Sequence, residues 1–384
     1  MPKTSPALAT PLREQLEKLA AFEPQELPVL SLYLNLAADQ HGRDRYDAFV
    51  RKAFADRQKA FKDNTAPRSS FDRDVQRIQE YLVDGINRAT NGLALFACHG
   101  ANEFFEAVQL QVPVDEHWLF IGSVPHLYPL AKLADQYPRY AAVVLDTNQA
   151  RIVVFGLAEV EQKHEVANVK TRRNSMGGWS QARYQRRAEN FHLHHVKEVV
   201  ETLDKIVAAE HIPHIVVVGD DVVVPLVKEQ LPQRLMDKLV VVRMEKHVPE
   251  DEFLHNTLEA LRQKDAETDA EVVEDVVGAW QANGLGTVGP EAVLTALQLG
   301  QVDELLLTGT PELLKPVQNI PEPVVGDLTA ETSAPSGPAD SDKLKLASEL
   351  VTRAQQTGAR VRIIEDAPLL SNFGGVAARL RFRV

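Results

Sequence analysis

The chain has 384 residues and a formal net charge of −12, with 44% hydrophobic and 25% charged residues. This composition excludes a disordered or fibrous protein, and the length predicts two or three domains. The acidic charge excludes a protein that coats nucleic acid through a basic surface, so we expect no DNA partner, and any RNA contact must be a local patch.

A single cysteine, Cys98, excludes an internal disulfide and a cysteine-based zinc site. The N-terminus does not resemble a signal peptide, and no stretch has the roughly 20 apolar residues of a membrane span. We therefore expect a cytoplasmic protein with no membrane partner.

The first third of the chain alternates helical and strand patterns. Apolar periodicity predicts helices at residues 12–20, 45–62 and 71–87, and strands at residues 28–34, 93–98 and 108–112. We assign residues 1–133 to an N-terminal α/β domain.

The middle third begins with apolar runs at residues 140–146 and 150–155, and the polar turn between them predicts a hairpin. Strands are predicted at residues 214–219 and 239–242, which are continuous β-branched runs, and a helix near Leu261 follows. Before these strands lies a helix whose apolar positions share one face: Val196, Val199, Val200, Leu203, Ile206 and Val207. We assign residues 134–265 to a second α/β domain.

The last third predicts helices at residues 266–282, 291–299 and 344–357, and strands at 304–307, 361–364 and 378–382. Residues 284–289 hold scattered glycines without the Lys-Ser/Thr of a nucleotide loop, which indicates a turn. Residues 326–342 are rich in Ser, Thr, Ala and Pro, which predicts a disordered insertion. Residues 266–384 thus form a third α/β domain, and the fold class is three α/β domains in series.

The segment 170–187 is basic and has no Asp or Glu. The paired glycines Gly177 and Gly178 permit close approach of the backbone to a partner, and Trp179 could stack on a base, an interaction worth about 1–3 kcal/mol. Candidate RNA-binding residues are Lys170, Arg172, Arg173, Arg183, Tyr184, Arg186 and Arg187. The alternative is a solvated loop whose arginines pair with acidic neighbours such as Glu189 or Glu198.

The sequence Gly177-Gly178-Trp179-Ser180-Gln181-Ala182-Arg183-Tyr184-Gln185-Arg186 resembles the loop of the archaeo-eukaryotic peptide-chain release factors. In that family, Gly-Gly-Gln is followed by a short linker and an Arg-aromatic-x-Arg helix start. Further similarity lies at residues 29–34, 91–96, 140–155, 289–307 and 372–378. The chain is identified as a bacterial member of this superfamily, similar to Pelota and to bacterial ribosome hibernation factors.

This resemblance implies a factor that occupies the aminoacyl-tRNA site of the ribosome and protects idle ribosomes. The first domain would be directed to the decoding site, and the loop of residues 176–181, with Gly177, Gly178, Trp179 and Ser180, to the peptidyl-transferase centre. The implied partners are ribosomal RNA, the peptidyl-site tRNA and a translational GTPase such as elongation factor Tu. No cofactor or metal is implied.

Two departures from the family pattern leave alternatives open. Trp179 stands where the family has its catalytic glutamine, and Gln181 lies two residues later. If Gln181 is catalytic, the protein is a peptidyl-tRNA hydrolase that rescues ribosomes, and a third reading is an RNA-binding protein that acts off the ribosome. The first domain has no Asn-Ile-Lys-Ser sequence, so stop-codon decoding is not implied.

Three histidines, His192, His194 and His195, lie together in the helix that follows the loop. Adjacent and i+2 positions on a helix face different directions, which disfavours a metal site. We expect these histidines to contact RNA phosphate instead.

Overall fold

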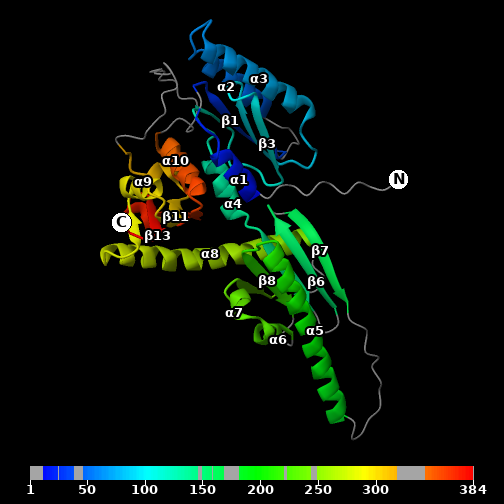
Figure 1. Cartoon of the computed structure of the whole chain (residues 1–384). Helices are drawn as coiled ribbons and strands as arrows, with labels where there is room; N and C mark the ends of the chain where they lie inside the picture. The colour runs from blue at the N-terminus through cyan, green and yellow to red at the C-terminus, as the bar shows by residue number, and fades with distance from the viewer. Residues whose placement is uncertain are drawn as a thin grey trace. The chain divides into compact units, whose positions relative to one another are not determined.

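The computed structural model describes residues 12–383, apart from residues 25, 39–45, 146–148, 158, 168–180, 220–222, 244–248 and 318–341. The chain forms two compact units, one of residues 137–267 and one that combines residues 10–136 with residues 268–384. The described residues form three sheets with helices around them (Figure 1). The predicted mixed α/β class is therefore confirmed, whereas the predicted Gly-Gly loop lies outside the described residues.

The first sheet of the combined unit is antiparallel, with strand order β3-β2-β1-β4. Its inner strand β1 pairs Leu32 with Leu95 of β2 and with Leu119 of β4. Helices α2 and α3 pack against this sheet through buried residues that include Phe54 and Phe71. The bounds are β1 Val29–Asn35, α2 Tyr46–Gln58, α3 Ala66–Asp84, β2 Gly92–Cys98, β3 Phe104–Leu110 and β4 Trp118–Gly122.

Helix α3 begins five residues before the predicted start at residue 71. Thr65 caps it, since the hydroxyl of Thr65 accepts a hydrogen bond from the backbone N–H of Arg68 at 3.4 Å, and a proline stands in the first turn. Both are ordinary helix-start signals. Strand β3 likewise begins earlier than the predicted residue 108, and strand β4 was not predicted.

The second sheet of the combined unit has strand order β10-β13-β11-β12, in which only β11 and β12 run parallel. One face packs Leu306 and Ala377 against Val273 and Val276 of helix α8. The bounds are α8 Glu250–Gln281, β10 Gly286–Val288, α9 Pro290–Gln298, β11 Val302–Thr308, η1 Pro311–Leu313, α10 Asp342–Gln356, β12 Arg360–Ile364, α11 Ala367–Ser371 and β13 Val376–Leu380.

Three predictions for this sheet need correction. Residues 284–289, expected to form a turn, include strand β10, where a Cβ on Gly286 would lie 2.3 Å from the carbonyl oxygen of Val276. The last strand is shifted two residues toward the N-terminus from its predicted place at 378–382. Of the predicted insertion 326–342, residues 326–341 lie outside the described residues, and Asp342 begins α10.

Helices α1 (Leu12–Ala20) and α4 (Tyr128–Gln136) contact α10, and α4 also contacts β12. The backbone N–H of Leu127 donates to the hydroxyl of Ser348 at 2.9 Å, and that of Ile363 donates to the Asp135 carboxylate at 3.1 Å. The hydroxyl of Tyr128 donates to the carbonyl of Gly309 at 3.1 Å. Two helices that precede residue 137 are therefore part of the packing around the second sheet.

The unit of residues 137–267 has a five-stranded sheet of order β7-β6-β5-β8-β9. The predicted hairpin is confirmed as β5 and β6, and β5, β8 and β9 run parallel. Helices α5 and α6 cover one face, and the first part of α8 covers the other. The bounds are β5 Tyr140–Leu145, β6 Gln149–Gly156, β7 Glu159–Ala167, α5 Gln181–Ala209, β8 His214–Gly219, α6 Val223–Gln230, α7 Gln233–Met236 and β9 Leu239–Val242.

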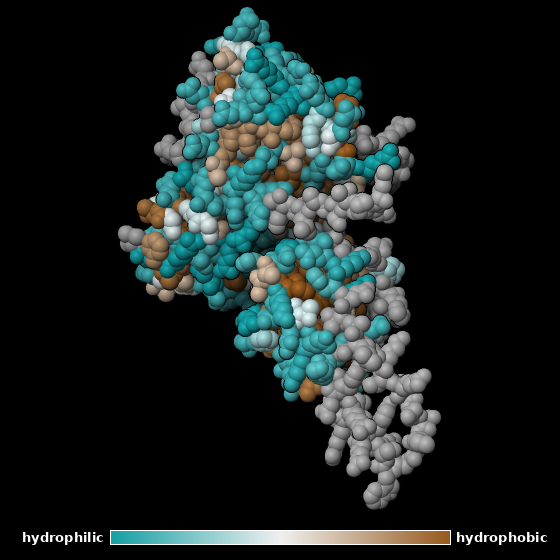
Figure 2. Space-filling model, turned by 45° about the vertical axis from the view of Figure 1, so that its right-hand side comes forward, coloured by the Kyte–Doolittle hydropathy of each residue, from teal (hydrophilic) through white to brown (hydrophobic). Residues whose placement is uncertain are grey.

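Within the described residues, no helix has both the length and the apolar character to cross a membrane. The face drawn in Figure 2 is mostly hydrophilic, with separate hydrophobic patches. Large hydrophobic side chains that are exposed include Val83, Trp280, Leu285, Leu299, Leu313 and Phe382. Scattered exposed side chains of this kind are ordinary on a protein surface.

Candidate functional site

The basic segment 170–187 connects strand β7 to helix α5. Strand β7 pairs antiparallel with β6 from Gly156 opposite Glu159 to Gln149 opposite Ala167, with one irregularity. Helix α5 has 29 residues, which corresponds to a length of roughly 40 Å. Seven predicted site residues lie outside the described residues: Lys170, Arg172, Arg173, Gly177, Gly178, Trp179 and Ser180.

The other five predicted site residues fall on the first two turns of α5: Gln181, Arg183, Tyr184, Arg186 and Arg187. The first turn of this helix contains no acidic residue. The N-terminus of a helix carries a partial positive charge, so arginines close to it lower the stability of the helix unless an anion lies nearby. The N-terminal end of a helix favours a nearby anion.

The second half of α5 is fixed to the sheet. Val196, Val199, Leu203 and Val207 are buried against strands β5, β6 and β8, which confirms the predicted buried face. Figure 1 shows the N-terminal part of α5 extending past the sheet. The helix thus carries its arginine-rich end away from the core that holds its other end.

Arg139 links β7 to the end of α5 opposite the basic segment. Its Nε donates to the Glu161 carboxylate of β7 at 2.7 Å, and its Nη2 donates to the Glu210 carboxylate, directly after α5, at 2.8 Å. The Nη1 also donates to the carbonyl oxygen of Glu210 at 2.8 Å. Hydrogen bonding from Arg139 lowers the pKa of the Glu210 carboxyl. Both elements that flank the basic segment are therefore joined at their far ends.

A glycine and a glutamine support this cluster. A Cβ on Gly156 would lie 1.9 Å from Glu161 Oε1, so only glycine leaves room for that carboxylate. Gln162 Nε2 donates to the second carboxylate oxygen of Glu210 at 3.3 Å. No sequence motif marked these residues, because the link between Arg139 and Glu210 spans 71 positions.

The histidines of α5 do not form one site. His195 is 1% exposed and belongs to the interior, so the expectation that it contacts RNA phosphate is wrong. His194 is exposed and His192 is half-buried. Among the described residues, no group of three or more His, Cys, Asp or Glu side chains could hold a metal ion.

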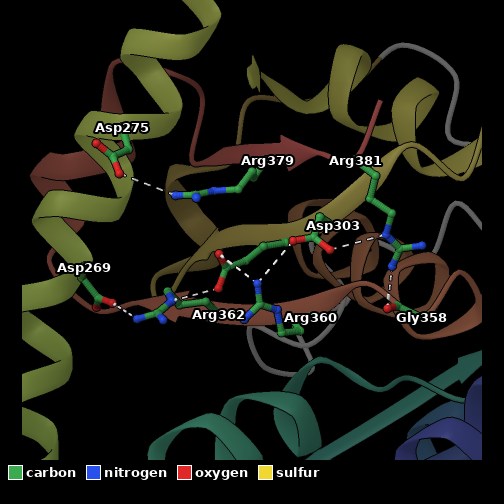
Figure 3. Close-up of polar contacts among 9 residues, drawn as sticks. Asp269, Asp275, Asp303, Gly358, Arg360, Arg362, Arg379 and Arg381 are labelled. Carbon is green, nitrogen blue, oxygen red and sulfur yellow. Dashed lines mark hydrogen bonds and ion pairs between the residues drawn. The ribbon is translucent and has the colours of Figure 1, made fainter. Parts of the chain in front are cut away.

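A second arginine-rich cluster lies on the sheet of β10–β13 (Figure 3). Arg362 Nη1 lies 2.9 Å from Asp269 Oδ1, and its Nε lies 3.4 Å from Glu304 Oε1. Further ion pairs join Arg360 and Arg381 to Asp303 and Arg379 to Asp275. We call these eight residues the C-terminal ion network: Asp269, Asp275, Asp303, Glu304, Arg360, Arg362, Arg379 and Arg381. Its four positive and four negative charges balance, and the pairs made by Asp269 and Asp275 join α8 to the sheet.

Comparison with known protein families gives two matches. Residues 125–278 match the model of bacterial archaeo-eukaryotic release factor family 10, and residues 266–384 match the model of eRF1 domain 3. Together the two matches extend from residue 125 to the end of the chain. No curated protein matches the chain.

Several solved structures are similar over most of the chain. The archaeal translation termination factor aRF1 is 17% identical, with 97% of each chain covered and a TM-score of 0.27. Dom34 from S. cerevisiae, a translation termination-like factor that interacts with Hbs1, is 13% identical, with 76% of this chain and 80% of Dom34 covered and a TM-score of 0.42. A model of ribosome-bound archaeal Pelota and ABCE1 is 15% identical, with 98% of this chain and 96% of that chain covered and a TM-score of 0.40.

Proposed function

Since the chain belongs to the bacterial archaeo-eukaryotic release factor family, whose members are release-factor-like translation factors, we propose that it occupies the aminoacyl-tRNA site of the ribosome. In this proposal, residues 176–181 enter the peptidyl-transferase centre and the protein protects idle ribosomes. The three predicted domains, residues 1–133, 134–265 and 266–384, would follow the release-factor arrangement.

The observation that carries this proposal is the charge of the basic segment. A chain with a net charge of −12 has 18 consecutive residues, 170–187, with one lysine, five arginines and no carboxylate. Arg183, Arg186 and Arg187 fall on the first two turns of α5, where the helix dipole already favours an anion. RNA phosphates would pair with the arginines and would also lie at the positive end of the helix dipole.

The loop chemistry favours occupancy over hydrolysis. Trp179 directly follows the two glycines and supplies an aromatic face for a base. Gln181 is the first residue of α5, so its backbone conformation is set by the helix and not by the loop. A plug that stacks on ribosomal RNA requires only the aromatic ring.

The alternative function is hydrolysis of the ester that joins the nascent peptide to tRNA. The Gly-Gly pair and the nearby Gln181 favour it, because the glycines would let the main chain enter a narrow cavity and the glutamine would position water. Ribosomal RNA and the tRNA would supply the rest of the site. This reaction requires no metal.

The proposed partners follow from the same family. Ribosomal RNA and the peptidyl-site tRNA would contact the middle domain, and the third domain would contact a translational GTPase such as elongation factor Tu. Dom34, which is similar to this chain, interacts with Hbs1. Binding of the full chain to a purified GTPase is measured separately from ribosome binding.

The test uses ribosomes that carry labelled peptidyl-tRNA and an empty aminoacyl-tRNA site. The protein should pellet with them without releasing peptide, and Trp179→Ala should weaken pelleting about tenfold, as loss of one stacking interaction implies. Gln181→Ala should have no effect. Trp280→Ala removes a tryptophan that is 42% exposed in the other unit and serves as the matched control.

The other outcomes separate the alternatives. Peptide release that Gln181→Ala abolishes, while pelleting remains, would establish the hydrolase instead. A protein that binds free RNA but does not pellet with ribosomes would support the off-ribosome reading.

A further inference from the structure

Strand β9 lies at one edge of the sheet of residues 137–267 and pairs only with β8 among the described residues. Its four residues, Leu239 to Val242, are all apolar, and each is half-buried. An edge strand presents unpaired backbone N–H and C=O groups to any further strand. Proteins normally protect such edges with charged side chains, proline or a bulge.

The opposite edge of the same sheet shows this protection. Strand β7 carries Glu159, Glu161, Lys163 and Glu165, a charged residue at every second position. Strand β9 has no charged residue along its length. The two edges of one sheet thus differ in whether they discourage the addition of a strand.

A cleft of about 400 Å³ lies beside β9. Leu239, Val240 and Val241 line it along the strand. One side consists of Lys228 from α6 and Met236 from α7, and the other consists of residues of α8 that include Ala260 and Lys264. Helices on both sides of the edge therefore flank the space that one added strand, about 4.8 Å away, would occupy.

The cleft is lined by two lysines and one glutamate. Met236 and Lys228 stand on one side, and Ala260, Lys264 and Glu267 stand on the other. Lys228 and Lys264 are exposed, and Lys264 forms an ion pair with Glu267 at 4.0 Å. Successive side chains of an added strand point to opposite sides, so each side would meet an apolar and an acidic residue.

We infer that this cleft binds an extended segment of a partner protein, rich in β-branched and acidic residues, as a sixth strand next to β9. Backbone hydrogen bonds to β9 would supply affinity, as in other cases of strand addition, and the lysines would favour acidic segments. This inference concerns a surface apart from the basic segment, and it stands whether or not the protein occupies the ribosome.

The probe is the fluorescent hexapeptide Val-Val-Glu-Glu-Val-Val, which places one glutamate and two valines on each side of an extended chain. Binding to the full-length protein is measured by fluorescence anisotropy. We expect Lys228→Glu with Lys264→Glu to weaken binding about tenfold, since two exposed charge pairs are reversed. The matched control, Lys197→Glu with Lys205→Glu, changes two exposed lysines of α5 and should leave binding unchanged.

Further peptides test the mode of binding. Val-Val-Lys-Lys-Val-Val should bind at least about tenfold more weakly than the acidic probe. Two further versions of the acidic probe carry methyl groups on alternate backbone nitrogens, at odd positions in one and at even positions in the other. The version whose methylated nitrogens face β9 should not bind, because those nitrogens no longer donate hydrogen bonds. Hydrogen exchange of residues 239–242 should slow when the unmodified probe is bound.

Three results would overturn the inference. The first is no binding of the acidic probe at millimolar concentration, and the second is binding that neither charge reversal nor methylation changes. The third is a concentration-dependent dimer that protects residues 239–242 without peptide, which would assign the edge to a second copy of the chain.

Discussion

The basic segment 170–187 and the C-terminal ion network are both rich in arginine but differ in their carboxylates. In the network, four arginines lie within 4.0 Å of four carboxylates, and Glu304, between two arginines, is 6% exposed. The basic segment has five arginines and no Asp or Glu. A count of arginines therefore does not identify an RNA site, whereas the lack of carboxylates in the same segment favours one.

The largest effect is expected from removing charge in the basic segment. Arg186→Ala with Arg187→Ala should weaken ribosome pelleting about 100-fold at low salt, and the slope of log affinity against log salt should fall by about one for each phosphate that is no longer neutralised. Arg360→Ala with Arg381→Ala removes the same charge from the network and should leave pelleting unchanged. If both double variants weakened pelleting equally, net charge alone would govern ribosome binding, and the basic segment would have no special role.

A third arrangement of charge is a buried carboxylate held by a backbone hydrogen bond. Asp74 of α3 is 2% exposed and accepts a hydrogen bond from the backbone N–H of His99 at 3.1 Å. Burial raises the pKa of this carboxyl from 3.8 to about 6. The folded state therefore binds the proton more tightly than the unfolded state.

The free energy of unfolding should fall as the pH rises from about 4 to about 6 and then level off, because ionisation is harder in the folded protein. Asp74→Asn should remove about 2 kcal/mol of this fall, as shown by urea unfolding across that interval. Asp72→Asn, an exposed position on the same helix, is the control. A pH profile that Asp74→Asn leaves unchanged would assign the titration to another group.

The next largest effect concerns the centre of the ion network. Glu304→Gln removes the charge that faces Arg360 and Arg362, and it should lower the free energy of unfolding by about 1–2 kcal/mol. Asp275→Asn changes a carboxylate that is 76% exposed and 3.8 Å from Arg379, so its effect should be within about 0.5 kcal/mol. Neither variant should alter ribosome pelleting if the network is structural.

The sequence predicted the regions whose pattern is local. The buried face of α5 and the β5–β6 hairpin follow from apolar spacing alone, and both match the structure. Strand β7 was missed because charged residues alternate along it, and this polar pattern gives a weak strand signal. The two helices expected near residues 261 and 266–282 are one helix, α8. Proline at 249 and the lack of Pro or Gly up to residue 277 were the signals for it.

The candidate site was only partly predictable for a different reason. Motif and charge locate the basic segment, but the residues that fix its flanking elements come from distant positions. Arg139, Glu161 and Glu210 have no motif, and their contact depends on how β7 and α5 pack on the sheet. Such contacts cannot be read from one sequence, because each partner alone is an ordinary surface residue.

The smallest effect is expected where arginine joins the elements that flank the basic segment. Arg139→Ala should lower the free energy of unfolding by about 1 kcal/mol, since its ion pairs with Glu161 and Glu210 are partly buried. Hydrogen bonding from Arg139 lowers the pKa of Glu210 below its ordinary value of 4.5. The stabilisation should therefore be complete above that pH and disappear as the pH falls through the lowered value.

Hydrogen exchange then separates a local from a global role for Arg139. Faster exchange confined to β7 would show that the arginine holds this strand against α5, and ribosome pelleting would fall less than after substitution of Arg186 and Arg187. Arg234→Ala, which breaks an exposed ion pair with Asp204 on the same unit, should change neither property. The contrary outcome is that Arg139→Ala weakens pelleting as much as the variants of the basic segment do and leaves hydrogen exchange unchanged. Arg139 would then contact RNA itself, despite its ion pairs with Glu161 and Glu210.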